Sequence, residues 1–333
     1  MIRQKTASGS AGPRGSTPAT ITRRRAIEII GGASLASAST SVAASSFYRW
    51  RGRVLGAVAS MAIAGVSADK AAALVRDCIC EIRRLEGVFS LYRSQSALSR
   101  LNAEKSLLAP APELLAVLTL ADAVHRSSAG AFDPSVQPLW RFYADRYARN
   151  PNRKDAPTDE ALARVRRAVG WRHVDFTGER IVFRRRGMAL TLNGSAQGYI
   201  GDQVAALFRR AGLRQALVNM GEVTAIGHHP SGRRWRAGIG QPGTADHVAS
   251  VLTLDDAAVA TSGHHGTHFD AAGQLSHIID PRTGRPAMDA TSTTVVAPSS
   301  AVADGLSTAA TLLSTKQIRR LAGEFPGATV YRT

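Results

Sequence analysis

The segment between residues 276 and 308 constrains this chain more than any other part of its sequence. It opens with Ser-His-Ile-Ile-Asp-Pro-Arg-Thr-Gly-Arg-Pro, in which proline and glycine predict a tight turn over residues 280–284. An uncharged run rich in β-branched residues then predicts a buried strand over 293–297. Ser299 or Ser300 is the expected N-cap of a helix that follows this strand.

Two oxygen-bearing side chains, Asp304 and Thr308, lie four residues apart in the predicted helix. This spacing places a carboxylate and a hydroxyl on one helical face, near a positively polarised N-terminus. Hard oxygen ligands beside such a terminus suit a Mg²⁺ ion that holds a diphosphate. Asp and Thr are also common early in helices that bind no metal, so the pattern by itself leaves a structural role open.

Charge and composition limit the classes of partner. The 333 residues are 44% hydrophobic and carry a net charge of +17, enough chain for one large or two modest globular domains. Residues 1–46 hold six basic residues and one acidic residue, a net +5, which leaves +12 for the remainder. No helix-turn-helix, zinc or RNP signature accompanies this charge, so we expect no nucleic-acid partner. No apolar run is long enough to span a membrane as a mature helix.

The first 46 residues have the order of an export signal. Arg23, Arg24 and Arg25 precede a mildly apolar stretch and then small residues that include Ala-Ser-Ala at 36–38. A twin-arginine pair in this setting is typical of a Tat signal, with an arginine-rich flexible tail as the alternative. We therefore expect a periplasmic protein whose residues 1–46 are a signal and flexible N-terminus, with a single domain over 47–333.

Neither cysteines nor histidines show metal-ligand spacing. Cys78 and Cys80 point to different faces of a predicted helix, so we expect no disulfide between them and small buried roles for both. Two thiols do not complete a zinc site. Five further histidines are expected to be exposed loop residues: His228, His229, His264, His265 and His268.

Hydrophobic periodicity predicts a mixture of helices and strands. Residues 144–160 are polar and contain proline, which predicts a solvated loop and a helix start. Helices are expected over 69–87 and 113–128, and the stretch 191–202 is expected to open a third helix that runs through 210. A strand is expected over 53–63 and another over 216–220, and a hairpin is expected to join 173–176 to 181–183. Small residues and glycines at 193–198 open the last of these helices, as in loops that bring backbone amides to a phosphate.

Taken together, these stretches resemble the ApbE family of FAD:protein FMN transferases. Six motifs occur in the family's order from about residue 50 to the C-terminus. They are Phe-Ser-Leu-Tyr at 89–92 with Ser96 and Leu101-Asn102; Gly-Ala-Phe-Asp-Pro at 130–134; Ala-Gln-Gly-Tyr at 196–199 with Asp202; Ala-Thr-Ser-Gly at 260–263; His-Ile-Ile-Asp-Pro-Arg-Thr-Gly at 277–284; and Ala-Asp-Gly-Leu-Ser-Thr at 303–308.

The resemblance implies an α+β fold of mixed sheets and helices, with two closely packed lobes forming one flavin-binding domain. It implies cleavage of FAD, release of AMP and transfer of FMN through its phosphate to a Thr or Ser hydroxyl of a periplasmic or membrane-anchored target protein. It assigns Mg²⁺ ligation to the Gly194 carbonyl, Asp304 and Thr308. It assigns FAD contacts to Leu55, Tyr92, Ala131, Phe132, Asp133, Gln197, Ile278 and Ser307.

Chemistry adds a general base to these expectations. A weakly acidic target hydroxyl needs a proton acceptor, and histidine is the usual one. We expect His277 in that role, with a structural histidine at the end of a strand as the alternative. The rings of Tyr92 and Phe132 could present faces to a flavin or adenine ring, or they could pack in the core.

Two positions depart from the family pattern. Gln197 stands where the family commonly has Lys, and Thr191 where it often has Asp, so the contact usually made by that Lys is in question. The Gln-bearing form with a Tat signal resembles the branch that accompanies nitrous-oxide reduction. Two alternatives stay open: an FAD pyrophosphatase that uses water as acceptor, and a non-enzymatic flavin carrier that tolerates loss of Asp304.

Overall fold

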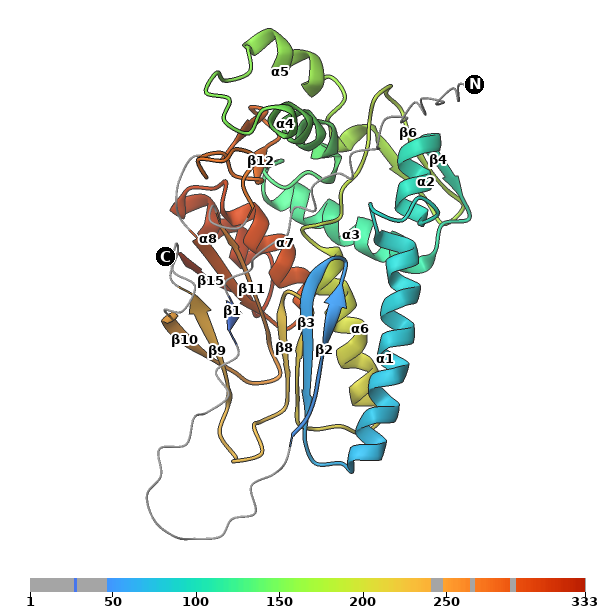
Figure 1. Ribbon diagram of the computed structural model, residues 1–333, viewed down its shortest axis with the longest axis vertical. Coiled ribbons are helices and arrows are strands. Elements are labelled where there is room, and N and C mark those ends of the chain that lie inside the picture. Colours follow the sequence, from blue (N-terminus) through green and yellow to red (C-terminus); the bar gives the residue numbers. More distant parts are fainter. Residues whose placement is uncertain (1–26, 29–46, 241–247, 264–266, 288–291, 333) are drawn as a thin grey trace, which may run out of the picture.

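The computed structural model describes residues 27–28, 47–240, 248–263, 267–287 and 292–332. Its centre is an antiparallel seven-stranded sheet in the order β15-β14-β11-β8-β7-β3-β2 (Figure 1). The strands are β2 (Tyr48–Val54), β3 (Ala57–Ile63), β7 (Ala216–Asn219), β8 (Val223–Ile226), β11 (Ala258–Gly263), β14 (Ser292–Ala297) and β15 (Thr329–Arg332).

Alternating side chains on these strands build two hydrophobic layers. Met61 and Val218 belong to the main core, whereas their chain neighbours Ala62 and Leu217 belong to a separate cluster. This division follows from the two-residue period of a strand, which sends successive side chains to opposite faces. The main core includes buried side chains of α1 (Ala68–Phe89), α3 (Pro112–Ser127), α6 (Ala196–Arg210) and α7 (Ser300–Ala310).

A smaller sheet covers the other hydrophobic layer. It has the order β1-β9-β10, formed by β1 (Ile27–Glu28), β9 (Trp235–Gly240) and β10 (Val248–Leu254). Trp235 and Leu254 join Leu217 and Val223 in the second cluster. The seven-stranded sheet is therefore packed on both faces.

The helices α4 and α5 lie at the upper end of the molecule in Figure 1 and contribute to a third small core. Leu139, Tyr143 and Tyr147 of α4 (Gln137–Arg149) pack there with Leu162 of α5 (Asp159–Arg166) and with Ile279. The other elements are α2 (Ala97–Glu104), β4 (Ser106–Leu108), η1 (Pro134–Val136), η2 (Trp171–His173), β5 (Val174–Phe176), β6 (Arg180–Phe183), β12 (Ile279–Asp280), β13 (Arg285–Pro286) and α8 (Thr315–Gly323).

The predicted α+β class is confirmed, as are the hairpin of β5 and β6 and the helix that begins after Ser299. The prediction of one strand over 53–63 is wrong, because the chain reverses at Leu55 and Gly56, which have φ angles of 47° and 84°. The prediction of a solvated loop from residue 144 is also wrong. Residues 144–149 continue α4, and Tyr147 is 2% exposed.

The cysteine prediction holds in part. Cys78 is buried and Cys80 is exposed, and both are free thiols. Burial raises the pKa of Cys78 to about 12. Residues 1–26 and 29–46 of the expected export signal, and His264 and His265, lie outside the described residues. No helix in the described part of the chain is long and apolar enough to cross a membrane.

Candidate active site

The centre of the candidate site is the crossing of α6 and α7. Gly198 lies so close to α7 that a Cβ atom there would be 2.4 Å from the Ser300 carbonyl oxygen. Asp304, one turn further along α7, is 1% exposed, and its Oδ2 accepts a hydrogen bond of 3.3 Å from the Gly198 N–H. This N–H belongs to the first turn of α6, whose positive end favours a carboxylate anion.

The three predicted metal ligands gather at this crossing. A Cβ on Gly194 would lie 3.0 Å from Thr308 Oγ1, and a Cβ on Gly305 would lie 3.9 Å from the Gly194 carbonyl oxygen. Thr308 Oγ1 also lies 3.3 Å from Ser262 Oγ. Within the described ranges no three His, Cys, Asp or Glu side chains come together as a metal site.

This donor set fits Mg²⁺ rather than a softer metal. It offers one carboxylate, one hydroxyl and one backbone carbonyl, all hard oxygens, and Mg²⁺ commonly binds through one or two carboxylates plus waters and substrate phosphates. A site of that kind needs no cluster of ionisable side chains. Asp304, Thr308 and Gly194 are therefore the residues that would hold the ion.

Two further hydroxyl groups, those of Ser307 and Ser262, lie next to the predicted metal ligands. Ser307 is fully buried, and its Oγ donates to the Asp304 carbonyl oxygen at 3.0 Å. Ser262 Oγ on β11 lies 2.9 Å from Ser307 Oγ. The sequence motif at 260–263 contained Ser262, but no role was predicted for this residue. The structure places it between the two hydroxyls of α7.

The α3–η1 turn brings another predicted group to the same place. A Cβ on Gly194 would lie 3.1 Å from an atom of the Phe132 ring, so that ring packs against the candidate ligand. Ala131 and Phe132 are both buried. The Asp133 carboxylate is engaged within the protein: Oδ1 accepts from the Ser135 N–H and hydroxyl at 2.8 and 2.6 Å, and Oδ2 accepts from the Trp171 N–H at 3.2 Å.

Gln197 follows the candidate ligand loop and is 3% exposed. Its Nε2 donates to the Met220 carbonyl oxygen at the end of β7, at 3.3 Å. The neutral amide supplies no positive charge at this position. Thr191 is held by its backbone, since its N–H donates to the Pro134 carbonyl oxygen at 2.8 Å.

Leu55 and the residue after Tyr92 both bond to Glu86 of α1. Glu86 Oε1 accepts a hydrogen bond of 2.9 Å from the Leu55 N–H, and its Oε2 pairs with Arg93 at 2.6 Å. Tyr92 is 75% exposed, so its ring is presented to solvent rather than packed in the core. The core-packing alternative for Tyr92 is thereby excluded in this structure.

His277 and Ile278 lie in the segment before β12. His277 Nδ1 lies 2.9 Å from the Thr267 carbonyl oxygen and 3.4 Å from the Thr267 N–H. A proton on Nδ1 would be donated to the Thr267 carbonyl oxygen, and Nε2 would then be the nitrogen able to accept a proton. Ile278 is buried, and its carbonyl oxygen accepts from the Ala287 N–H at 2.8 Å.

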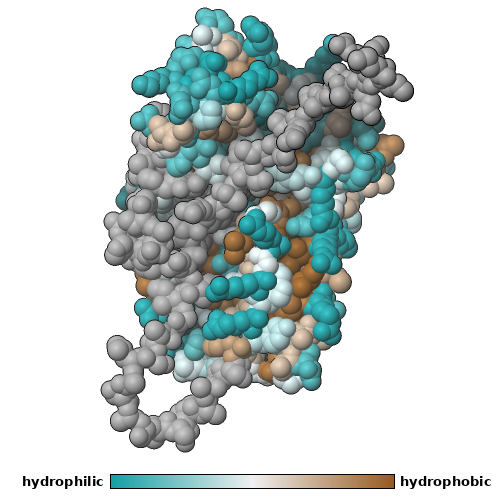
Figure 2. All heavy atoms as spheres, in the orientation of Figure 1, coloured by the Kyte–Doolittle hydropathy of each residue, from teal (hydrophilic) through white to brown (hydrophobic). Residues whose placement is uncertain are grey.

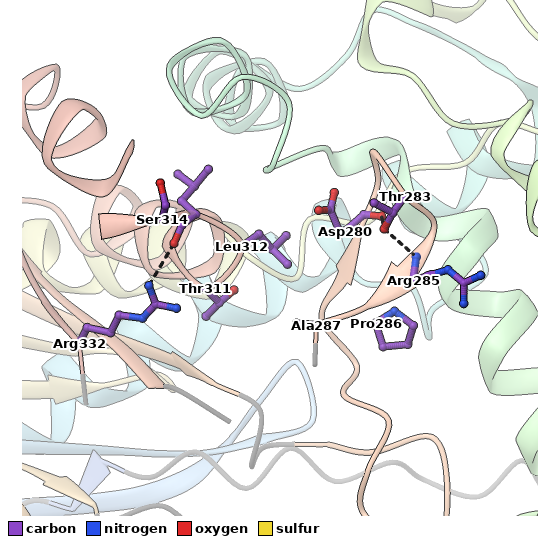
Figure 3. A pocket seen from close by; sticks show the side chains of 10 residues that line it. Asp280, Thr283, Arg285, Pro286, Ala287, Thr311, Leu312, Ser314 and Arg332 are labelled. Carbon is purple, nitrogen blue, oxygen red and sulfur yellow. Dashed lines mark hydrogen bonds between the residues drawn. The ribbon is translucent and has the colours of Figure 1, made fainter. Parts of the chain in front are cut away.

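A pocket of about 480 Å³ lies beside this segment, between the β12–β13 hairpin and the α7–α8 connection (Figure 3). Its walls are Asp280, Thr283, Arg285, Pro286, Ala287, Thr311, Leu312, Leu313, Ser314 and Arg332. None of the predicted catalytic, flavin or metal residues lines it. We therefore place the candidate site by its converging oxygen donors and not by this cavity.

Asp202 is a contributor whose role the sequence did not reveal. Its carboxylate accepts from the Ser299 hydroxyl and the Ser300 N–H, both at 2.7 Å, and from the Ala301 N–H at 3.0 Å. Burial raises the pKa of Asp202, and these hydrogen bonds oppose that shift. An acidic residue on α6 thus caps the helix that carries Asp304.

Comparison with known proteins gives this geometry a context. Residues 55–331 match the ApbE family. The chain is 28% identical to the FAD:protein FMN transferase of Salmonella typhimurium, over 81% of this chain and 79% of that protein. It is 32% identical to the FAD:protein FMN transferase of Treponema pallidum, over 74% and 73% of the two chains.

Solved structures show the same arrangement of elements. The flavin transferase ApbE from Vibrio cholerae superposes with a TM-score of 0.73 at 25% identity, over 86% of this chain and 93% of that chain. The apo form of the Pseudomonas stutzeri flavinyl transferase ApbE superposes with a TM-score of 0.72 at 26% identity, over 87% and 92%.

Proposed function

This chain belongs to the ApbE family, and we propose that it transfers FMN from FAD to a threonine or serine hydroxyl of a target protein. The observation that carries the proposal is the convergence of Gly194, Asp304 and Thr308 where α6 crosses α7. The relatives named FAD:protein FMN transferase support the substrate and the type of reaction.

The bond changes follow from the chemistry of FAD. The acceptor hydroxyl oxygen forms a bond to the phosphorus of the FMN half, and the bond from that phosphorus to the AMP oxygen breaks. The products are a phosphoester-linked FMN and AMP. A bound Mg²⁺ would neutralise the diphosphate and stabilise charge on the transferring phosphoryl group.

The protein's own residues prepare both reactants. Asp304 places a buried carboxyl group beside the α6 N-terminus, and the Phe132 ring packs against Gly194 on another side of the site. His277 accepts the proton of the acceptor hydroxyl at Nε2, because its Nδ1 is oriented by the Thr267 carbonyl oxygen. A base of this kind typically contributes about a hundred- to ten-thousand-fold in rate.

The test is an in vitro transfer reaction. Purified full-length protein is incubated with FAD, Mg²⁺ and candidate acceptor flavoproteins, and flavin fluorescence of the acceptor is read on a denaturing gel. We expect a fluorescent acceptor band, equimolar AMP, and no band with EDTA. AMP and free FMN without a labelled acceptor would identify a pyrophosphatase, and FAD binding without AMP would identify a carrier.

We also propose that the chain is exported by the Tat pathway and acts in the periplasm. The support is the order of Arg24-Arg25, apolar stretch and Ala-Ser-Ala in the sequence. Replacing Arg24→Lys and Arg25→Lys together should retain the protein in the cytoplasm, which immunoblots of cell fractions would show. Normal periplasmic accumulation of the double variant would reject the Tat assignment.

A further inference from the structure

Positive charge is concentrated in one short part of the chain. Residues 141–186 contain 13 basic and 6 acidic residues, a net +7 of the +17 carried by all 333 residues. These residues include most of α4 and all of α5, η2, β5 and β6, and the labelled elements α4, α5 and β6 lie at the upper end of the molecule in Figure 1. The surface over α4 and α5 is mostly hydrophilic in Figure 2.

Tertiary packing joins two arginine-bearing segments of this region. A Cβ on Gly187 would lie 3.2 Å from the Cβ of Ala168, so the segment after β6 rests against the end of α5. The Arg184 N–H also donates to the His173 carbonyl oxygen at 2.9 Å. We name the resulting surface the arginine ridge, made of Arg166, Arg167, Arg172, Arg184, Arg185 and Arg186.

Most arginines of the arginine ridge form no ion pair within the part of the chain that the structure describes. Arg184 pairs with Asp175, and Arg166 donates to the Arg282 carbonyl oxygen. The other four, Arg167, Arg172, Arg185 and Arg186, are exposed and form no ion pair with any described residue. Clustered cations without counter-charges create a positive field that attracts anionic partners.

Arginines of both segments influence the pKa of His173. Desolvation lowers the pKa of His173, and Arg185, Arg172 and Arg184 lower it further. Three guanidinium groups from two segments therefore act on one imidazole. The clustering is thus a property of the folded molecule as well as of the sequence.

The arginine ridge is also directly connected to the turn that follows the candidate base. Arg166 reaches the Arg282 carbonyl oxygen, and a Cβ on Gly284 would lie 2.8 Å from the Arg166 side chain. Arg285 pairs with Asp159 of α5 at 2.6 Å. The turn at 280–284 begins three residues after His277, so a partner bound on the ridge would lie beside the candidate site.

We propose that the arginine ridge is the docking surface for the acceptor protein, and that the acceptor presents an acidic surface to it. The inference rests on the proposed transferase function, which requires a protein to be held while its hydroxyl reaches the site. Complementary charge on the two partners accelerates encounter and fixes orientation. Continuity between the arginine ridge and the turn after His277 places that charge where an acceptor must approach.

A second set of exposed arginines supplies a matched control. Arg49, Arg51 and Arg53 alternate along β2, an edge strand of the seven-stranded sheet, and all three are exposed. Charges on an edge strand are a common protection against pairing with other sheets. Reversing two of these charges changes the net charge as much as reversing two charges of the arginine ridge.

The experiment compares Arg185→Glu/Arg186→Glu with Arg49→Glu/Arg51→Glu in the full-length protein, on the acceptor that the wild type labels. We expect kcat/KM for the acceptor to fall about tenfold or more in the first variant only, through KM, because steering charges act on encounter. FAD affinity, the maximal rate and transfer to a short peptide spanning the acceptor residue should stay at wild-type values. The defect should diminish with salt, since the Debye length is about 3 Å at 1 M ionic strength.

Other outcomes of these experiments distinguish acceptor docking from a membrane contact and from failure of the proposed transferase function. Equal losses in both variants, or none in either, would overturn the docking role. Poly-L-glutamate should inhibit the wild type competitively against the acceptor and inhibit Arg185→Glu/Arg186→Glu less. Binding to phosphatidylglycerol vesicles that requires these two arginines, without inhibition by poly-L-glutamate, would make the arginine ridge a membrane contact and reject the proposal. Absence of acceptor labelling by the wild type would instead reject the transferase function.

Discussion

Gly198 of α6 and Ser300 of α7 approach so closely that the contact admits no side chain: a Cβ at position 198 would lie 2.4 Å from the Ser300 carbonyl oxygen and 2.6 Å from its carbonyl carbon. Real Cβ atoms essentially never come that near to backbone. The close approach also positions the Gly198 N–H to donate to Asp304 Oδ2. The glycine that lets the two helices pack together therefore also positions the carboxylate of the candidate metal ligand Asp304.

Gly198→Ala should separate α6 from α7 and destabilise the protein by about 1 to 3 kcal/mol, as overpacked core sites usually do. Gly201→Ala is the matched control on the same helix, because its Cβ would meet nothing nearer than Ser300 Oγ at 3.5 Å. Urea unfolding followed by circular dichroism measures both. A Gly198→Ala protein as stable as the control would show that the helices move apart without cost.

Asp304→Asn should abolish FMN transfer while leaving the fold near intact, because the amide keeps the size of the side chain and removes the only carboxylate of the predicted ligand set. Direct Mn²⁺ binding, followed by electron paramagnetic resonance, should weaken in parallel. Thr308→Val and Thr308→Ser provide a second comparison, since only serine retains the hydroxyl. Normal labelling of the acceptor by Asp304→Asn would remove this residue from the metal site.

His277→Asn should reduce the single-turnover rate of transfer about a hundred- to ten-thousand-fold, because asparagine can hydrogen-bond but cannot serve as the base. FAD affinity should change little, and His228→Asn, at an exposed loop position, should behave as wild type. Both quantities are measured on the same preparation. A variant that binds FAD poorly but transfers normally at saturation would assign His277 a structural role.

Asp202→Ala should destabilise the protein by about 1 to 3 kcal/mol, because three donors at the start of α7 lose their acceptor. The same change should weaken Mn²⁺ binding, since α7 carries Asp304 and Thr308. Asp145→Ala removes an exposed carboxylate of α4 and is the control. Unaltered Mn²⁺ affinity in a destabilised Asp202→Ala protein would limit Asp202 to a role in stability.

Asp256 predicts a specific pH dependence of stability. The Gly227 N–H, with a smaller contribution from Arg209, holds the pKa of Asp256 below its ordinary value of 3.8. A carboxyl group whose pKa is lowered on folding stabilises the protein above that ordinary value, and the contribution is lost as the pH falls through the folded pKa. Asp256→Asn should therefore be less stable than wild type at pH 7.

The difference between Asp256→Asn and wild type should shrink as the pH falls below the ordinary carboxyl pKa of 3.8, because the wild-type carboxyl then becomes protonated. Asp256 is 61% exposed, so we expect a small effect that salt reduces further. Thermal unfolding across this pH range, with Asp145→Asn as the control, gives the comparison. A difference that is constant with pH would reject the charge-based explanation.

Several features were predictable from the sequence because their causes are local. Ser299 caps α7 through a hydrogen bond from the Val302 N–H, and the four-residue spacing of Asp304 and Thr308 sets them on one face of that helix. Pro281 and Gly284 likewise determine the turn between β12 and β13, where Gly284 has a φ angle of 79°. Such features need only neighbours along the chain.

Local signals failed where burial or a distant partner decides the outcome. The polar sequence at 144–149 reads as a loop, yet it is helical because Tyr147 packs against the α4–α5 core. The run at 53–63 has one continuous strand pattern, but the chain turns at Leu55, whose N–H is held by Glu86 from α1. In each case a tertiary contact overrides the local preference.

Motif order and local periodicity were sufficient to predict the family, the α+β class and the residue types of the candidate site. The folded arrangement was needed to show that Gly198 meets Ser300, that Asp202 caps α7 from another helix, and that the segments of Arg167 and Arg185 pack together. Hydrogen-bond periods and turn preferences act over only a few residues. Close approach, capping between helices and clustering of charge depend on how elements far apart in the chain pack together.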